Sequence, residues 1–211
     1  MRVRLTGITR PVVDDIPDTA SLLAHHARVS NTANQGNHET GPKLLRSLIR
    51  RKEWSPLEMV HLTMEIETTR DVARQMLRHR SFSFQEFSQR YSEVDDDPVF
   101  REARLQHPTD RQASVECEPD RDWDAMQEVA WEQAIHAYRY AIHTGIAKEV
   151  ARAVLPEGMT RSLLYMAGSL RSWVHYCELR CDEKTQKEHR LIAQEVRSII
   201  LKEFPMLEGV F

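Results

Sequence analysis

Hydrophobic and polar positions alternate most regularly along residues 60–68, as in a β-strand with one buried face. The apolar positions of this stretch share one side of an extended chain, and they are Val60, Leu62, Met64 and Ile66. A shorter alternation between Val3 and Thr9 predicts a second strand. These two segments are the strands that we expect from the sequence.

Apolar residues at helical spacing and capping signals predict the other elements. Asp18 is placed to cap a helix that reaches Ala27, and Gly145 to end a later one. Ser55-Pro56-Leu57-Glu58 has the form of a capping box, which predicts a helix start. Further helices are expected to begin at Gly41 and Asp71 and to span residues 123–143, 146–154, 160–180 and 183–204. Residues 31–41 and 93–121 have the composition of loops.

Composition narrows the class of protein. The 211 residues contain 29 Lys or Arg and 32 Asp or Glu, and the net charge of −3 disfavours a nucleic-acid binder. Cys117, Cys177 and Cys181 form no Cys-x-x-Cys pair, which is typical of free thiols in a reducing, cytoplasmic setting. We expect no signal peptide, and no apolar run approaches the roughly 20 residues that a membrane span needs.

Residues suited to binding a ligand are most concentrated in the segment 78–90, Arg-His-Arg-Ser-Phe-Ser-Phe-Gln-Glu-Phe-Ser-Gln-Arg. Arginine's planar fork matches phosphate oxygens, so arginines clustered beside aromatic residues predict a cradle for a phosphate and a cofactor. The arginines follow a predicted helix, whose dipole favours cations at its C-terminus, so side chains must bind the anion. A solvated charged face is the ordinary explanation for one arginine, but four aromatics within ten residues weigh against it.

Other candidate residues are weaker. Arg171 and His175 stand one helical turn apart and can converge on one ligand, although His175 alone is more often a surface or core residue. Cys177 and Cys181, also one turn apart, could bind a metal, but inert packing is the favoured interpretation and no metal is expected. With 7 glycines the chain has no glycine-rich phosphate loop.

The motif Arg78-His79-Arg80, seven residues, Ser88 resembles the signature of the flavin-dependent thymidylate synthases, and Gln89-Arg90-Tyr91 continues the similarity. Weaker segments in the family's order extend the resemblance over most of the chain, and these are residues 27–30, 55–58, 72–75, 149–152, 155–156 and 171–180. The resemblance implies an α+β fold, a small, mostly antiparallel sheet flanked by helices, in a single domain of residues 1–211. It also implies a homotetramer with active sites shared between subunits.

The resemblance implies a reaction as well. In this family dUMP is methylated at uracil C5 to dTMP, 5,10-methylenetetrahydrofolate gives the carbon, and FAD reduced by NADPH supplies the hydride without a protein nucleophile. Arg180 matches the catalytic residue that stabilises ionised uracil N3. Residues matching the flavin site are Ser30, Ser55, Glu58, Arg78, His79, Arg80, Glu86, Ser169, Arg171 and His175. Residues matching the dUMP site are Gln75, Arg78, Glu86, Phe87, Ser88, Gln89, Arg90, Arg152 and Arg180.

The sequence departs from the family pattern in two places. Glu53 and Met59 stand where many members have histidines, and Ser169 stands where the family usually has an asparagine, so contacts to folate and flavin differ in detail. Two rival interpretations remain open. One is a single-strand or RNA binder that stacks bases on residues 78–90, and the other is a flavoprotein that kept the fold but lost methylation.

Overall fold

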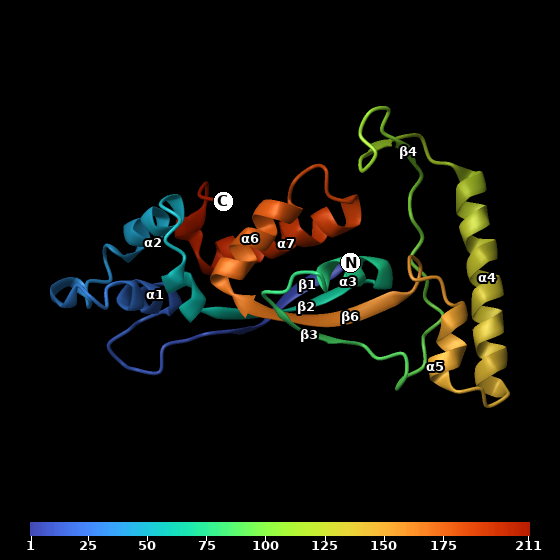
Figure 1. Cartoon of the computed structure of the whole chain (residues 1–211), viewed down its shortest axis with the longest axis horizontal. Helices are drawn as coiled ribbons and strands as arrows, with labels where there is room; N and C mark the ends of the chain where they lie inside the picture. Colours follow the sequence, from blue (N-terminus) through green and yellow to red (C-terminus); the bar gives the residue numbers. More distant parts are fainter.

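The computed structural model describes residues 1–211 and is built on a four-stranded antiparallel sheet with the order β1-β2-β6-β3. The strands are β1 (Arg2–Ile8), β2 (His61–Thr69), β6 (Arg161–Ser169) and β3 (Ser83–Glu86). Figure 1 shows the sheet at the middle of the molecule, with helices over one face and another group of helices beyond one end. The expected α+β class is confirmed.

The central strands β2 and β6 pair over their whole length. Their register runs from His61 opposite Ser169 to Thr69 opposite Arg161. Alternate residues of both strands point to the helix-covered face and are fully buried, namely Leu62, Met64, Ile66, Leu164 and Met166. Burial on one face alone explains why the alternation of β2 is visible in the sequence.

Helices and a hairpin complete the fold. The α-helices are α1 (Thr19–Ala27), α2 (Gly41–Arg50), α3 (Arg70–Met76), α4 (Arg121–His143), α5 (Lys148–Ala151), α6 (Leu170–Arg180) and α7 (Lys187–Glu203). The 3-10 turns are η1 (Thr32–Asn34), η2 (Ser55–Met59), η3 (Arg152–Val154) and η4 (Pro205–Leu207). Strands β4 (Arg104–Gln106) and β5 (Ser114–Glu116) form a separate two-stranded sheet. None of these helices combines the length and the apolar character that crossing a membrane requires.

Helices α6 and α7 pack over the sheet and enclose the main core (Figure 1). The indole Nε1 of Trp173 donates to the Leu62 carbonyl at 3.2 Å, which fixes α6 to β2. Cys177 is buried in this core, as the packing interpretation expects, and Cys181 packs against it. Between the two helices, the hydroxyl of Tyr176 lies 3.1 Å from Nε2 of the fully buried His189.

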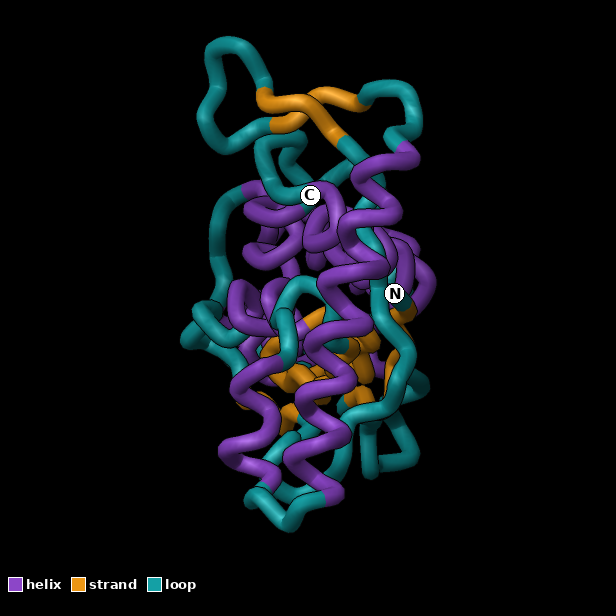
Figure 2. The backbone as a smooth tube through the Cα atoms, turned by 90° about the vertical axis from the view of Figure 1, so that its right-hand side faces the viewer, coloured by secondary structure: helices purple, strands orange, loops and turns teal.

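Helices α4 and α5 with η3, residues 121–154, form an arm beyond one end of the sheet (Figures 1 and 2). The arm has a small core of its own, made of Trp131, Ile135, Tyr138, Ala141, Ala151 and Leu155. The preceding segment lies along α4, where Val94 N–H donates to the Tyr138 hydroxyl at 3.0 Å. Large apolar side chains such as Met126 and Val129 stay exposed on α4.

Most expected elements are confirmed. The two predicted strands are β1 and β2, and α-helices start at or beside the predicted positions Asp18, Gly41 and Asp71. Asp18 caps α1 by accepting from Ser21 N–H at 2.7 Å. Gly145 follows α4 with a φ of 80°, the left-handed conformation that glycine adopts most easily.

Some predictions are wrong. The helix expected over residues 160–180 begins only at Leu170, because residues 161–169 form β6, whose pairing with β2 overrides local helix propensity. The predicted capping box is absent, since Ser55 makes no cap hydrogen bond in η2 and Glu58 pairs instead with Arg171. The expected loop 93–121 contains the β4–β5 hairpin, and the expected helix 146–154 is divided into α5 and η3.

The aromatic residues of the 78–90 stretch are divided between core and surface. Phe82 is buried in the main core and Phe84 packs against it, whereas Phe87 and Tyr91 are exposed. Two of the four rings are therefore unable to serve as a base-stacking platform, which argues against the RNA-binding interpretation.

Gly168 supports a first prediction, because β6 passes directly under the Phe82 ring there. A Cβ added at Gly168 would stand 2.5 Å from a ring carbon of Phe82. We expect Gly168→Ala to lower the free energy of unfolding by about 1–3 kcal/mol, because the added methyl overpacks the core. Urea titration measures the change. The matched control is Gly36→Ala, where nothing lies within 4 Å, and equal stabilities of the two variants would contradict the packing argument.

His189 supports a prediction about pH. Burial, Arg180 and His79 lower its pKa from 6.5 to about 3. Below about pH 6.5 His189 therefore binds a proton in the unfolded chain but not in the folded one. The free energy of unfolding consequently falls as the pH drops from 6.5 toward 3. We expect the wild type to lose up to about 1.4 kcal/mol per pH unit more than His189→Gln in this window. Urea titrations at several pH values measure the difference, and a constant gap between the two proteins would contradict the prediction.

Candidate active site

The C-terminal ends of α3 and α6 meet over the sheet. Because β2 and β6 are antiparallel, β2 leads into α3 at one end of the sheet and β6 leads into α6 at the other. Helix α6, with 11 residues and a length of about 16 Å, then returns toward α3. At this junction Nε of Arg180 donates to Nε2 of His79 at 2.9 Å. The fold thereby joins two of the sequence-predicted site residues.

His79 orients Arg180 without neutralising it. Burial and the charges of Arg180 and Arg78 lower the pKa of His79 to about 4, so the ring is neutral at pH 7. Since its Nε2 accepts from Arg180, its proton is on Nδ1. No carboxylate pairs with Arg180, so the positive charge of its guanidinium is available to a negatively charged ligand.

Neighbouring arginines differ in their partners. Arg74 pairs with Glu157 at 2.6 Å, and the buried Arg70 pairs with Glu86 at 3.3 Å. Arg78 and Arg80 are exposed in the turn after α3 and make no ion pair. The turn therefore has the uncompensated positive charge that the sequence predicts for an anion cradle.

Gln75, on the last turn of α3, adjoins the junction. Its Oε1 lies 3.2 Å from Nδ1 of His189, and its Nε2 donates to Oε1 of Gln186 at 2.7 Å. The ring of Tyr176 packs edge-on against His79, with centroids 5.0 Å apart. Tyr176 and His189 thus support both Gln75 and the junction from inside the core.

A second group of predicted residues lies where η2 meets the start of α6. Arg171 Nη1 donates to Oε1 of Glu58 at 2.7 Å, and the Ser169 side chain caps α6. A hydrogen bond from Ser169, together with Arg171, holds the pKa of Glu58 below its usual range. His175, one turn after Arg171, stacks edge-on against Trp54 with centroids 4.5 Å apart.

Two predicted flavin residues border this second group. Ser55 opens η2 with an exposed side chain, and Ser30 is exposed after α1. Val29, the neighbour of Ser30, lines one surface hollow together with Met59 at the end of η2. The segments around Ser30, Ser55 and Glu58 are therefore adjacent in space, although they are separate in the sequence.

Glu86, at the end of β3, is held by protein groups. Its Oε1 accepts from Ser162 Oγ at 2.8 Å and lies 3.3 Å from Arg70 Nη1. This pairing anchors β3 to the start of α3 and to β6. The expected contacts of Glu86 with flavin and dUMP stay predictions.

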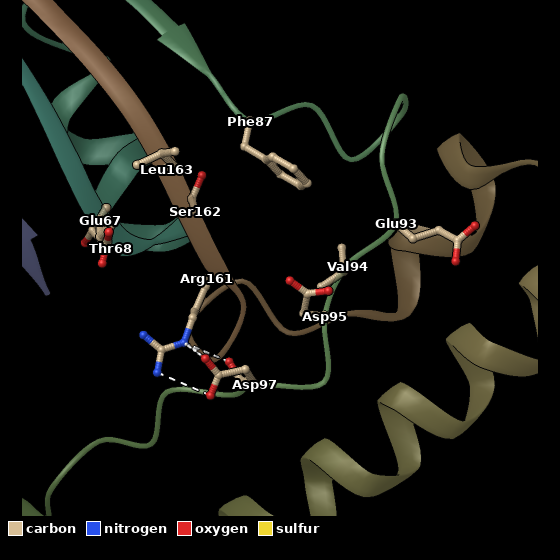
Figure 3. A pocket seen from close by; sticks show the side chains of 10 residues that line it. All are labelled: Glu67, Thr68, Phe87, Glu93, Val94, Asp95, Asp97, Arg161, Ser162 and Leu163. Carbon is tan, nitrogen blue, oxygen red and sulfur yellow. Dashed lines mark hydrogen bonds and ion pairs between the residues drawn. The ribbon is translucent and has the colours of Figure 1, made fainter.

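Phe87 borders a cavity of about 260 Å³ between β6 and residues 93–97 (Figure 3). The charged residues that line it are Glu67, Glu93, Asp95, Asp97 and Arg161. Arg161 bonds Asp97, and the remaining carboxylates would repel a phosphate. This cavity is therefore unsuited to a nucleotide phosphate, and the site lies elsewhere.

A third group of predicted residues lies beside the arm. Ser88 and Arg90 line a surface hollow of about 460 Å³ together with Lys148, and Arg90 makes an ion pair to α5 at 3.4 Å. Gln89 is 3% exposed, and its amide Nε2 has no hydrogen-bond partner. Arg152, half-buried in η3, makes no ion pair. These donors suit a phosphate.

Within one chain the second and third groups stay apart. Phe87 N–H bonds the Leu163 carbonyl at 2.8 Å, whereas Ser169 lies six residues further along β6. At a rise of about 3.3 Å per residue, these positions are about 20 Å apart. Figure 1 accordingly shows α5 beyond one end of the sheet and the start of α6 near the other.

Sequence reasoning missed several residues of the site. Arg70, Tyr176, His189 and Trp54 support predicted residues directly. Tyr176 and His189 lie on the buried faces of helices. In the helical pattern of the sequence, such residues cannot be told apart from core residues that only pack. In the sequence Lys148 is distinguished only by its charge. In the structure it lines the same hollow as Ser88 and Arg90.

Comparison with known proteins identifies the family of this chain. The family model described as "Thymidylate synthase complementing protein" matches residues 11–206. A flavin-dependent thymidylate synthase from Synechocystis is 46% identical over 97% of this chain and 96% of its own length. A probable flavin-dependent thymidylate synthase from Paramecium bursaria Chlorella virus 1 is 43% identical over 98% of this chain and 97% of its own length.

A solved structure extends the comparison to the fold. The UMP/dUMP methylase PolB from Streptomyces cacaoi, bound with 5-Br dUMP, superposes with a TM-score of 0.84 at 26% identity. The match covers 100% of this chain and 94% of that one. With the family model spanning nearly the whole chain and relatives above 40% identity, this protein belongs to the family of flavin-dependent thymidylate synthases.

Proposed function

We propose that this chain methylates dUMP at uracil C5 to give dTMP, with 5,10-methylenetetrahydrofolate as carbon donor and NADPH as reductant of FAD. The observation that carries the proposal is Arg180, whose charge meets only the neutral His79 at the α3–α6 junction. A fixed, uncompensated cation stabilises negative charge that develops on a bound ring. Full-length relatives named for this activity support the assignment.

The residues present fit a flavin nucleotide. Arg78 and Arg80 are exposed without ion-pair partners, which suits the pyrophosphate, and His79 lies between them. The group formed by Glu58, Ser169, Arg171, His175, Ser30 and Ser55 offers hydrogen bonds and stacking surface on one side. When bound and reduced by NADPH, the flavin would supply the hydride for the reaction.

Arg180 is the residue to which we assign the chemical step. Its guanidinium stabilises the uracil ring as N3 loses a proton, and the hydrogen bond to His79 holds it in place. No cysteine is placed as a nucleophile. A hydrogen bond with Cys181, together with burial, raises the pKa of Cys177, and Cys181, although the same bond lowers its pKa, packs against the core.

We further infer that two subunits complete each site in a homotetramer. Ser88, Gln89, Arg90 and Arg152 supply donors for the dUMP phosphate beside the arm, about 20 Å from the flavin-side residues at the start of α6 in the same chain. Closed symmetric assembly would bring the arm of one subunit to the junction of another. Exposed apolar residues on α4 support such an interface. The free cysteines support a cytoplasmic location.

Substitution of Arg180 tests the catalytic assignment. We expect Arg180→Ala to lower kcat for dTMP formation about a hundredfold or more, because the charge on uracil is no longer stabilised. Flavin absorbance of the purified variant should persist. The matched control is Arg74→Ala, since Arg74 is exposed and paired with Glu157 outside the junction. Turnover unchanged in Arg180→Ala would refute the role.

Subunit mixing tests the shared site. Arg152→Ala and Arg180→Ala are each expected to be nearly inactive, because each removes a cation needed by the same ligand. Co-expression of the two variants should restore a measurable part of dTMP formation, since mixed assemblies contain sites with both arginines intact. Sites built within single chains would give no recovery, and that result would contradict the shared arrangement.

A further inference from the structure

A chain of hydrogen-bonded side chains runs through Gln75 and the exposed Gln186, and both of its ends are buried. Its members, in order, are Tyr176, His189, Gln75, Gln186 and Glu188. The successive contacts are 3.1, 3.2, 2.7 and 2.9 Å. Tyr176 and His189 are buried, and so is the distant carboxylate of Glu188.

An ionised carboxylate ends this chain. Arg104 Nη2 donates to Oε1 of Glu188 at 2.6 Å, and Arg101 Nη1 lies 3.5 Å from the same oxygen. Burial opposes the charged form, but the hydrogen bond from Gln186 and the two arginines outweigh it and hold the pKa of Glu188 below its usual range. An ionised carboxylate only accepts hydrogen bonds.

The carboxylate fixes the direction of every bond in the chain. Gln186 must donate to Glu188, so its carbonyl oxygen accepts from the amide N–H of Gln75. The carbonyl oxygen of Gln75 then faces His189, which must donate from Nδ1 and accept from the Tyr176 hydroxyl at Nε2. Reversing one member would set two donors or two acceptors against each other, and at His189 and Glu188 this would happen in a buried place.

We propose that this chain fixes Gln75 as a donor toward the ligand, so that the site accepts a pyrimidine with a carbonyl at that edge and rejects one with an amino group. His189 donates to the carbonyl of Gln75 and Gln186 accepts one N–H, so the second N–H is the donor left for a ligand, while the carbonyl already accepts one hydrogen bond. The inference rests on the proposed function, in which Gln75 contacts dUMP. Uracil has carbonyls at C2 and C4, whereas cytosine has an amino group at C4.

His189 acts in this scheme as a positioning residue. It contacts no substrate, but without it the amide of Gln75 keeps only its bond to Gln186, and its carbonyl is free to accept from an amino group. A polar site of fixed direction discriminates strongly, because the wrong ligand leaves buried donors unpaired. A merely structural His189 would weaken all nucleotides equally and would leave the preference among them unchanged.

The experiment compares nucleotide binding by the FAD-loaded full chain. Dissociation constants are measured for dUMP, for dCMP with its amino group at C4, and for 2′-deoxyisocytidine monophosphate with its amino group at C2. The variants are His189→Leu, His189→Gln, Tyr176→Phe and Gln75→Leu. The matched control is Tyr138→Phe, which removes a buried tyrosine hydroxyl that accepts from Val94 N–H in the arm.

We expect wild type to bind dUMP more tightly than one of the two analogues. This is dCMP if Gln75 contacts the C4 carbonyl and 2′-deoxyisocytidine monophosphate if it contacts the C2 carbonyl. His189→Leu and Gln75→Leu should reduce this preference about tenfold, the value of one neutral hydrogen bond. Tyr176→Phe should leave the preference unchanged, because Glu188 still sets the direction of the bonds through Gln186 and Gln75. His189→Gln, which keeps one donor and one acceptor, should restore the preference, and Tyr138→Phe should leave it unchanged.

Two negative outcomes are distinguishable. A chain that binds FAD but neither binds dUMP nor forms dTMP would refute the proposed function and this inference with it. A chain that forms dTMP while His189→Leu and Gln75→Leu keep the wild-type preference over both analogues would overturn the inference alone. If His189→Leu fails to fold, Gln75→Leu decides the question, because Gln75 is only half-buried.

Discussion

The antiparallel pairing of β2 with β6 is the constraint on which the site depends. Each strand runs directly into a helix, and the shared register places the starts of these helices at opposite ends of the sheet. Both strands span about 30 Å, whereas α6 extends about 16 Å, so α6 ends over the sheet, where α3 also ends. Arg180 therefore meets His79 through the geometry of the sheet, without any local signal in either helix.

Charge pairing separates the structural arginines from those left for a ligand. Arg70 is paired within the core, and Arg101 and Arg104 hold the buried Glu188. Buried charges need such partners because their desolvation is costly. Arg78 and Arg180 have no carboxylate partner, so their charge is satisfied only by water or by an anion. The chain is slightly acidic overall, yet its fold concentrates unpaired positive charge at one junction.

The sequence predicted what local patterns encode. The alternation in β2, the Asp18 cap and the glycine after α4 each reflect interactions within a few residues. It failed for β6, whose burial pattern depends on partners about 100 residues away in β2 and whose Leu, Met and Ala content also suits a helix. The arginine motif lies in a turn where Arg78 and Arg80 are exposed, but the contacts from Tyr176 and His189 come from helices that only the folded chain brings near.

Two neutral histidines explain how the polar side chains at the junction are held in place while the charge of Arg180 stays available to a ligand. His79 and His189 are each kept uncharged by burial and by the nearby charge of Arg180. A carboxylate in place of His79 would orient Arg180 equally well, but it would cancel the charge that the ligand requires. A neutral imidazole provides direction without opposite charge, and the same property lets His189 orient Gln75. Because both histidines stay neutral in the folded chain, stability falls in acid. The same neutrality leaves Arg180 without an opposite charge while His79 holds it in place.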